Sequence, residues 1–124
     1  MPTKSELKYH IVWCTKYRRK VLTEDIQKSL KKEIENTSLK NGYVLEAIET
    51  MEDHVHIFVK ASVKDSVHRI VSQIKGVSSH NLRKNFPELK RKLPCLWTRS
   101  YYAGTVGFVS EETIKNYIKN QKNK

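Results

Sequence analysis

The chain has 124 residues and a formal net charge of +11, with 24 Lys and Arg against 13 Asp and Glu. This length predicts a single domain over residues 1–124. From the elements below, we expect its core at about 7–108 and a C-terminal helix at about 110–124. No apolar run reaches the roughly 20 residues that span a bilayer, and Cys14 and Cys95 form no CxxC motif. These features argue against a membrane protein or a disulfide scaffold and predict a cytoplasmic protein that binds anions.

The positive charge is concentrated in the second half of the chain. Residues 1–53 carry 10 Lys and Arg against 9 Asp and Glu, whereas residues 54–124 carry 14 against 4. Aromatic side chains are interleaved with the basic ones: Tyr17, Phe86, Trp97, Tyr101 and Tyr102. This pattern is typical of nucleic-acid binding, where phosphates pair with cations and bases stack on aromatic rings. The alternative is a solvated basic surface.

In the first half, residues 9–15 are rich in β-branched and aromatic side chains and predict a strand, which a basic loop at residues 16–20 follows. Thr23 is an N-cap candidate for a helix that ends at Gly42. Its apolar side chains recur every four residues: Ile26, Leu30 and Ile34. Residues 43–51 and 54–59 predict two strands joined by a turn of hairpin length.

In the second half, a long helix is expected from Ser66 to about Asn85. Its predicted buried face consists of Val67, Ile70, Val71, Ile74, Val77 and Leu82. Phe86 and Pro87 end it, and residues 88–94 predict a basic connection or short turn. A last strand region is expected at residues 96–97 and 101–108, and Ser110 caps a final helix that carries Tyr117.

The resulting order is β-α-β-β-α-β with an added C-terminal helix. This order predicts an α+β fold of the ferredoxin-like or RRM-like type, a four-stranded antiparallel sheet with helices on one face. Because that fold serves many functions, the function has to be inferred from the site.

His54-Val55-His56 is the first candidate functional motif. Side chains alternate along a strand, so both imidazoles would lie on one face, with Val55 directed into the core. Two adjacent imidazoles form half of a divalent-metal site, although two surface histidines also occur by chance. His10, His68 and His80 are interpreted as isolated, and Cys14 as a small core residue.

Two further features are ambiguous on their own. Tyr117 and Gln121 lie four residues apart on one side of the last helix. A tyrosine hydroxyl can attack phosphorus and an amide oxygen can bind a metal, but Tyr117 equally extends an apolar stripe. Gly76 lies in mid-helix, at a cost of about 1 kcal/mol relative to Ala. It indicates either the close approach of a DNA backbone or a tolerated kink.

Taken together, these segments resemble one family over nearly the whole chain. The matching stretches are YHIVWCTKYRRKVL at residues 9–22, DHVHI at 53–57, IKG at 74–76, SS at 78–79, LR at 82–83, LP at 93–94, LW at 96–97, and YI at 117–118 with Gln121. They resemble the IS200/IS605 single-tyrosine (Y1) transposases, in which two histidines around a hydrophobic residue form the HUH motif.

The resemblance implies a metal-dependent enzyme that binds hairpins in single-stranded DNA at insertion-sequence ends. It implies that Tyr117 is the nucleophile and forms a 5′-phosphotyrosine, and that His54, His56 and Gln121 hold Mg²⁺ or Mn²⁺. It also implies a homodimer with composite active sites in trans, in which the HUH pair of one subunit meets the tyrosine helix of the other.

Basic side chains in the matching segments and around them are expected to contact DNA: Lys16, Arg18, Arg19, Lys75, Arg83, Lys84, Arg91, Lys92 and Arg99. Two other functions remain open. One is a non-catalytic or domesticated module that binds nucleic-acid hairpins, and the other is a metal-dependent nuclease that hydrolyses the phosphodiester bond.

Overall fold

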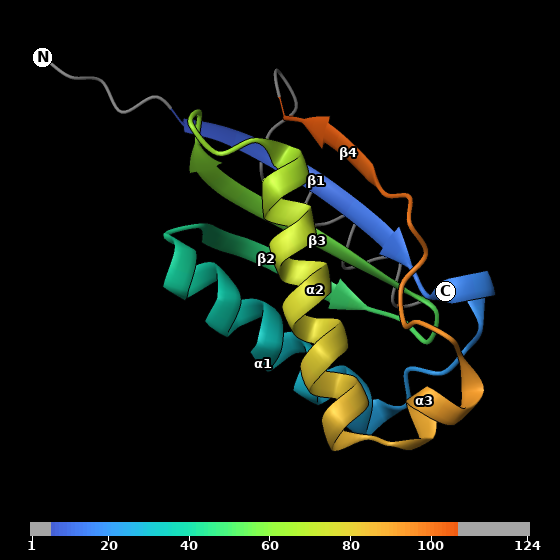
Figure 1. The fold of residues 1–124 in the computed structure, drawn as a ribbon. Helices are drawn as coiled ribbons and strands as arrows, with labels where there is room; N and C mark the ends of the chain where they lie inside the picture. Colours follow the sequence, from blue (N-terminus) through green and yellow to red (C-terminus); the bar gives the residue numbers. More distant parts are fainter. Residues whose placement is uncertain (1–5, 107–124) are drawn as a thin grey trace, which may run out of the picture.

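A computed structural model describes residues 6–106 and contains a four-stranded sheet (Figure 1). Its strands are β1 (Glu6–Cys14), β2 (Val44–Thr50), β3 (His54–Ser62) and β4 (Tyr102–Thr105). They are ordered β2-β3-β1-β4, and all neighbours are antiparallel. This order confirms the predicted ferredoxin-like fold. The helix expected at about 110–124 lies outside the described residues.

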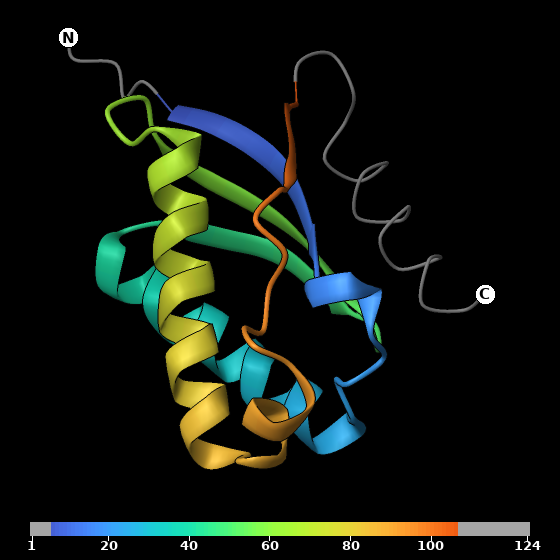
Figure 2. The ribbon, with the colours of Figure 1, turned by 45° about the vertical axis from the view of Figure 1, so that its right-hand side comes forward.

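Two long helices cover one face of this sheet (Figures 1 and 2). In α1 (Glu24–Asn41), the Thr23 hydroxyl accepts a hydrogen bond from the Ile26 amide at 3.3 Å, and Gly42 ends the helix with a φ of 78°. In α2 (Val67–Asn85), the Ser66 hydroxyl accepts from the Arg69 amide at 3.1 Å. The Thr23 cap is the one that the sequence predicts, and α2 begins next to Ser66, where the helix is expected. Within residues 6–106, no helix is both long and apolar enough to cross a bilayer.

Three short segments differ from the prediction. The basic stretch after α2 forms a helix, α3 (Glu88–Lys92), because Pro87 at its N-cap has helical dihedral angles. The basic loop contains a 3₁₀ turn, η1 (Lys16–Arg18). Within the predicted last strand region, Trp97 forms only an isolated bridge with Thr15, and the described strand is limited to β4.

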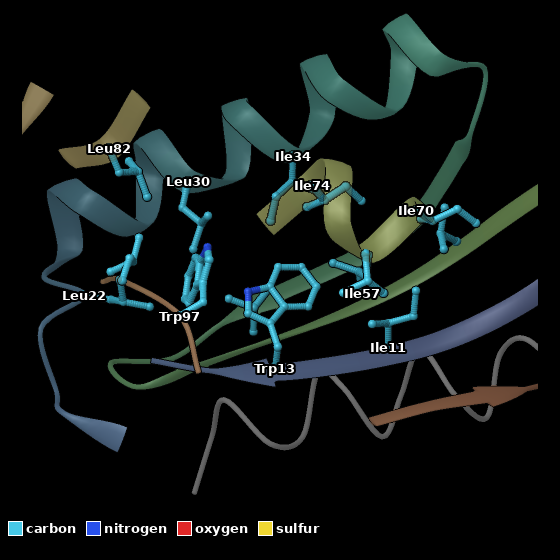
Figure 3. Close-up of a cluster of buried hydrophobic side chains, with 14 of the residues drawn as sticks. Ile11, Trp13, Leu22, Leu30, Ile34, Ile57, Ile70, Ile74, Leu82 and Trp97 are labelled. Carbon is cyan, nitrogen blue, oxygen red and sulfur yellow. The ribbon is translucent and has the colours of Figure 1, made fainter. Parts of the chain in front are cut away.

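The main core lies between the sheet and the two long helices (Figure 3). Ile11, Trp13 and Ile57 enter it from the sheet, and Ile34 and Ile74 enter it from the helices. The rings of Trp13 and Trp97 meet edge to face, with centroids 5.8 Å apart, a favoured geometry for aromatic pairs. This packing fixes which face of the sheet stays uncovered by α1 and α2.

The buried stripe of α2 differs from the prediction at Val67, which is only partly buried, and at Val77. Val77 is 41% exposed, and Ser78 is buried in its place. The Ser78 hydroxyl donates to the Ile74 carbonyl at 2.6 Å and accepts from Trp97 Nε1 at 3.1 Å. The polar atoms are therefore satisfied inside the core, as burial requires.

We predict that Ser78→Ala destabilises the protein by about 1 to 3 kcal/mol, because the Trp97 indole N–H loses its acceptor. Ser72→Ala, on the exposed side of the same helix, is the control and is expected to change stability by less than about 0.5 kcal/mol. Urea unfolding of the two variants measures the difference. Equal stability of both would contradict a role for the Ser78–Trp97 hydrogen bond.

Candidate functional site

The histidine motif lies on β3, on the sheet face opposite α1 and α2. Val55 and Ile57 point into the core and are fully buried, so His54 and His56 point to the other face. Their ring centroids lie 5.0 Å apart, which confirms that both imidazoles share a face. His56 is only 6% exposed, and Val12 and Glu49 are its cross-strand neighbours.

Asp53 holds the first histidine of the motif. Its Oδ1 lies 2.6 Å from His54 Nδ1, and its Oδ2 accepts from the Arg18 guanidinium at 3.4 Å. Burial of the Asp53 carboxyl opposes ionisation, but the hydrogen bond and charge of His54, together with Arg18, hold its pKa below the ordinary value. A carboxylate at Nδ1 leaves Nε2 as the nitrogen of His54 that could bind a metal, and such a carboxylate is the usual support of a metal-binding histidine.

His10 stands beside the second histidine, so the interpretation of His10 as isolated is wrong. Its Nε2 lies 3.3 Å from His56 Nδ1, and the two rings are stacked with centroids 5.5 Å apart. Burial lowers the pKa of His10. Burial and then the nearby His54 and His10 lower the pKa of His56 to about 4. Both therefore favour the neutral form at neutral pH, which is the form that binds metals.

These residues fit half of a divalent-metal site. His54 and His56 supply two nitrogen donors from one strand, and Asp53 orients one of them. Over residues 6–106, no three His, Cys, Asp or Glu side chains form a group that could hold a metal. Gln121 and Tyr117 lie outside that range. The predicted Mg²⁺ or Mn²⁺ site thus has two of its three proposed ligands side by side.

The basic loop beside this site has a strained backbone. Tyr17 and Arg18 adopt left-handed φ values of 59° and 53°, which cost about 1 to 2 kcal/mol for each L-residue. The buried Thr15 side chain donates to the Arg19 carbonyl at 2.7 Å and holds the loop in this shape. Arg18 is thereby placed against Asp53, while Tyr17 remains 69% exposed.

A second basic feature lies along α2 and α3. A groove of about 860 Å³, here called the basic groove, is lined by Gly76, Ser79, His80, Arg83, Lys84 and Lys90. The predicted DNA contacts Arg83 and Lys84 meet there, together with His80 and Lys90, which the sequence did not point to as DNA contacts. A Cβ at Gly76 would meet no atom within 4 Å. The described fold therefore does not require glycine at this position.

The remaining predicted DNA contacts are not gathered in this groove. Lys75 Nζ donates to the Thr98 carbonyl at 2.6 Å, and burial lowers its pKa. Lys75 thus fixes the segment that leads to β4. Arg91, Lys92 and Arg99 are exposed outside the groove, as are Arg18 and Arg19 of the basic loop, while Lys16 there is half-buried.

The structure changes the sequence-based interpretation of the interleaved aromatic side chains and of Cys14. Of the five interleaved aromatics, only Tyr17 and Tyr102 are largely exposed, whereas Trp97 is buried and Phe86 and Tyr101 pack against the core. Cys14 is half-buried and pairs with His54 across the strands, so it lies on the histidine face and outside the main core. Strand pairing with β3 decides the position of Cys14.

Comparison with known proteins gives a consistent result. The family model described as "Transposase IS200 like" matches residues 3–121. The ISDra2 transposase TnpA of Deinococcus radiodurans is 34% identical over 121 residues, which cover 96% of this chain and 86% of that protein. The IS200 transposase of Salmonella typhimurium is 35% identical over 122 residues, covering 96% and 79%.

Two solved structures are similar in fold. A putative transposase from Deinococcus radiodurans has a TM-score of 0.79 at 34% identity, with 98% of this chain and 95% of that chain covered. A REP-associated tyrosine transposase bound to a REP hairpin has a TM-score of 0.65 at 12% identity, with 95% and 66% covered. The second similarity concerns the fold alone.

We predict that the metal-free protein loses stability as the pH falls from 6.5 towards 4. The pKa of His56 is about 4 in the folded protein against an ordinary 6.5, so the unfolded chain binds more protons over this window. Urea unfolding in a chelator should show a decrease of about 1 to 2 kcal/mol between pH 7.5 and pH 5. His56→Gln should reduce this loss of unfolding free energy, whereas His68→Gln, at an exposed position, is the control and should leave it unchanged. An equally large loss in His56→Gln would contradict the prediction.

Proposed function

Because the chain belongs to the family of IS200-like transposases, we propose that it is a metal-dependent transposase acting on single-stranded DNA at insertion-sequence ends. The observation that carries this proposal is the pair of histidines on β3. They lie on one face of a rigid strand, and the Asp53 carboxylate lies within 2.6 Å of one ring. A pair fixed in this way suits phosphoryl-transfer chemistry, in which precise placement of charge lowers the barrier.

The proposed reaction is a transesterification at one phosphodiester. The Tyr117 oxygen attacks phosphorus and forms a bond to the 5′ phosphate, while the bond to the 3′ oxygen breaks and that oxygen leaves as a 3′-OH after taking up a proton. Rejoining is the reverse attack by a 3′-OH on the phosphotyrosine. One ester bond replaces another in each direction, so no ATP is required.

Within this proposal, His54, His56 and Gln121 hold Mg²⁺ or Mn²⁺. When bound, such an ion neutralises charge on the phosphoryl oxygens. The chain's own contribution is to keep the His56 imidazole neutral through burial and to orient the His54 ring through its contact with Asp53. The roles of Tyr117 and Gln121 come from the family resemblance.

DNA hairpins are the proposed substrate, and the basic groove is the proposed contact with their backbone. Arg83, Lys84 and Lys90 line it together, and clustered cations bind phosphates by releasing counterions. A protein of the same fold has been solved with a REP hairpin bound, which supports the idea. Tyr17 on the basic loop, next to Arg18, which contacts Asp53, offers an exposed ring for base stacking.

We further propose a homodimer with composite active sites in trans. Within the described part of the chain, β4 lies at the edge of the sheet and is four residues long. The outer edge of such a strand is where the backbone of a second sheet can pair. Sedimentation of the free protein tests the oligomeric state.

The nucleophile is tested with Tyr117→Phe. Single-stranded DNA that carries an insertion-sequence end is labelled on either side of the cut in separate reactions and incubated with Mn²⁺. Wild type is expected to give a metal-dependent protein–DNA adduct that carries the 3′-side fragment, and Tyr117→Phe is expected to give none while still binding the hairpin. An adduct retained in Tyr117→Phe would contradict the assignment. Cleavage with free 5′ ends would indicate a hydrolytic nuclease, and hairpin binding without cleavage would indicate a non-catalytic module.

The groove is tested with the double variant Lys84→Gln/Lys90→Gln. Losing two phosphate contacts should weaken hairpin binding about tenfold or more and reduce the slope of log K against log salt concentration by about 1.4 to 1.8. Lys32→Gln/Lys40→Gln removes the same charge from exposed positions of α1 and serves as the control. If both double variants had the same affinity and salt slope, the groove would not be the contact surface.

A further inference from the structure

We propose that His10 is a positioning residue that fixes the tautomer of His56, so that His56 Nε2 carries the lone pair for the metal. This inference rests on the proposed metal-dependent function and adds a residue from β1 to the site. Its basis is the approach of His10 Nε2 to His56 Nδ1 at 3.3 Å. The contact joins residues that are 46 positions apart in the chain.

The chemistry of two neutral imidazoles leaves two arrangements. A neutral ring has one N–H, so either His10 donates from Nε2 or His56 donates from Nδ1. In the first arrangement the proton of His56 resides on Nε2, which then cannot bind a metal. In the second, His10 accepts, and Nε2 of His56 keeps its lone pair. Since His10 occupies the Nδ1 side of His56 in both, only the second allows His56 to be a ligand.

The same logic already operates at His54. The Asp53 carboxylate contacts His54 Nδ1 at 2.6 Å and can only accept, so it selects the tautomer with the lone pair on Nε2. The two histidines of the motif thus have an acceptor on the same ring atom, one from the adjacent residue and one from a neighbouring strand. Acceptors of this kind fix the ring and raise ligand basicity.

His10 is itself held on its other side by β4. The Tyr102 ring meets His10 edge to face, with centroids 6.2 Å apart. Gly104 is the cross-strand neighbour of His10, and a Cβ at Gly104 would lie 2.8 Å from the Tyr102 hydroxyl oxygen. Glycine therefore leaves the room that Tyr102 occupies. Side chains from β4, β1 and β3 thus form one row, from Tyr102 through His10 to His56 and His54.

The test measures the tautomer and the metal affinity separately. Histidine tautomers are read from long-range ¹H–¹⁵N spectra of the metal-free protein, and Mn²⁺ binding is measured by calorimetry without DNA. His10→Phe keeps a ring but loses the acceptor, His10→Gln keeps an acceptor, and His68→Phe makes the same change at an exposed position of α2. His54→Ala removes a ligand and controls for Mn²⁺ binding elsewhere.

Wild type and His68→Phe are expected to hold the proton of His56 on Nδ1. His10→Phe should shift His56 to a mixture of tautomers and weaken Mn²⁺ binding about 10- to 100-fold, while His10→Gln should retain most of both properties. A wild-type His56 protonated on Nε2, or an unchanged tautomer and affinity in His10→Phe, would overturn the proposal. Wild type that binds Mn²⁺ no better than His54→Ala would instead contradict the metal-dependent function, and with it the purpose assigned to His10.

Discussion

The pairing of β1 with β3 in one register is the constraint on which the rest of the molecule depends. It places Ile11 opposite Ile57 and Trp13 opposite Val55, and these side chains form the part of the core that the sheet contributes, facing α1 and α2. Because side chains alternate along a strand, a slip by one residue would exchange the two faces and expose these core side chains. The hydrophobic core therefore sets the histidine face: His54, His56 and His10 lie there because their neighbours are buried on the other side.

Local signals in the sequence predict what local physics determines. Thr23 caps α1 as expected, α2 begins at the predicted place, Gly42 ends α1 in the left-handed conformation, and the alternation in residues 54–56 places both imidazoles on one face. Contacts across the sheet are different, because no short pattern encodes them. His10 meets His56 through strand pairing over 46 positions. The signal that was available was the alternation of β1, which already separates His10 from Ile11, combined with the predicted strand order.

Burial of single side chains was the least predictable feature, since it depends on what packs above them. Ser78 enters the core in place of Val77 because Trp97 brings a hydrogen-bond donor to it. Lys75 is similarly drawn to the carbonyl of Thr98. A count of positive charges cannot distinguish a cation with a structural role from one that can bind phosphates. In the fold, Lys75 bonds to the Thr98 carbonyl, Arg18 lies in the strained basic loop beside Asp53, and other basic residues line the basic groove along α2 and α3.

In the proposed mechanism, this face of the sheet presents two histidines, each with Nδ1 occupied, to a divalent metal. The most direct measurement is a crystal structure of the protein with Mn²⁺, in which anomalous scattering locates the ion. We expect one Mn²⁺ bonded to Nε2 of both His54 and His56, with Asp53 and His10 on their Nδ1 atoms. Mn²⁺ bonded through Nδ1, or bound elsewhere with both histidines uncoordinated, would contradict it.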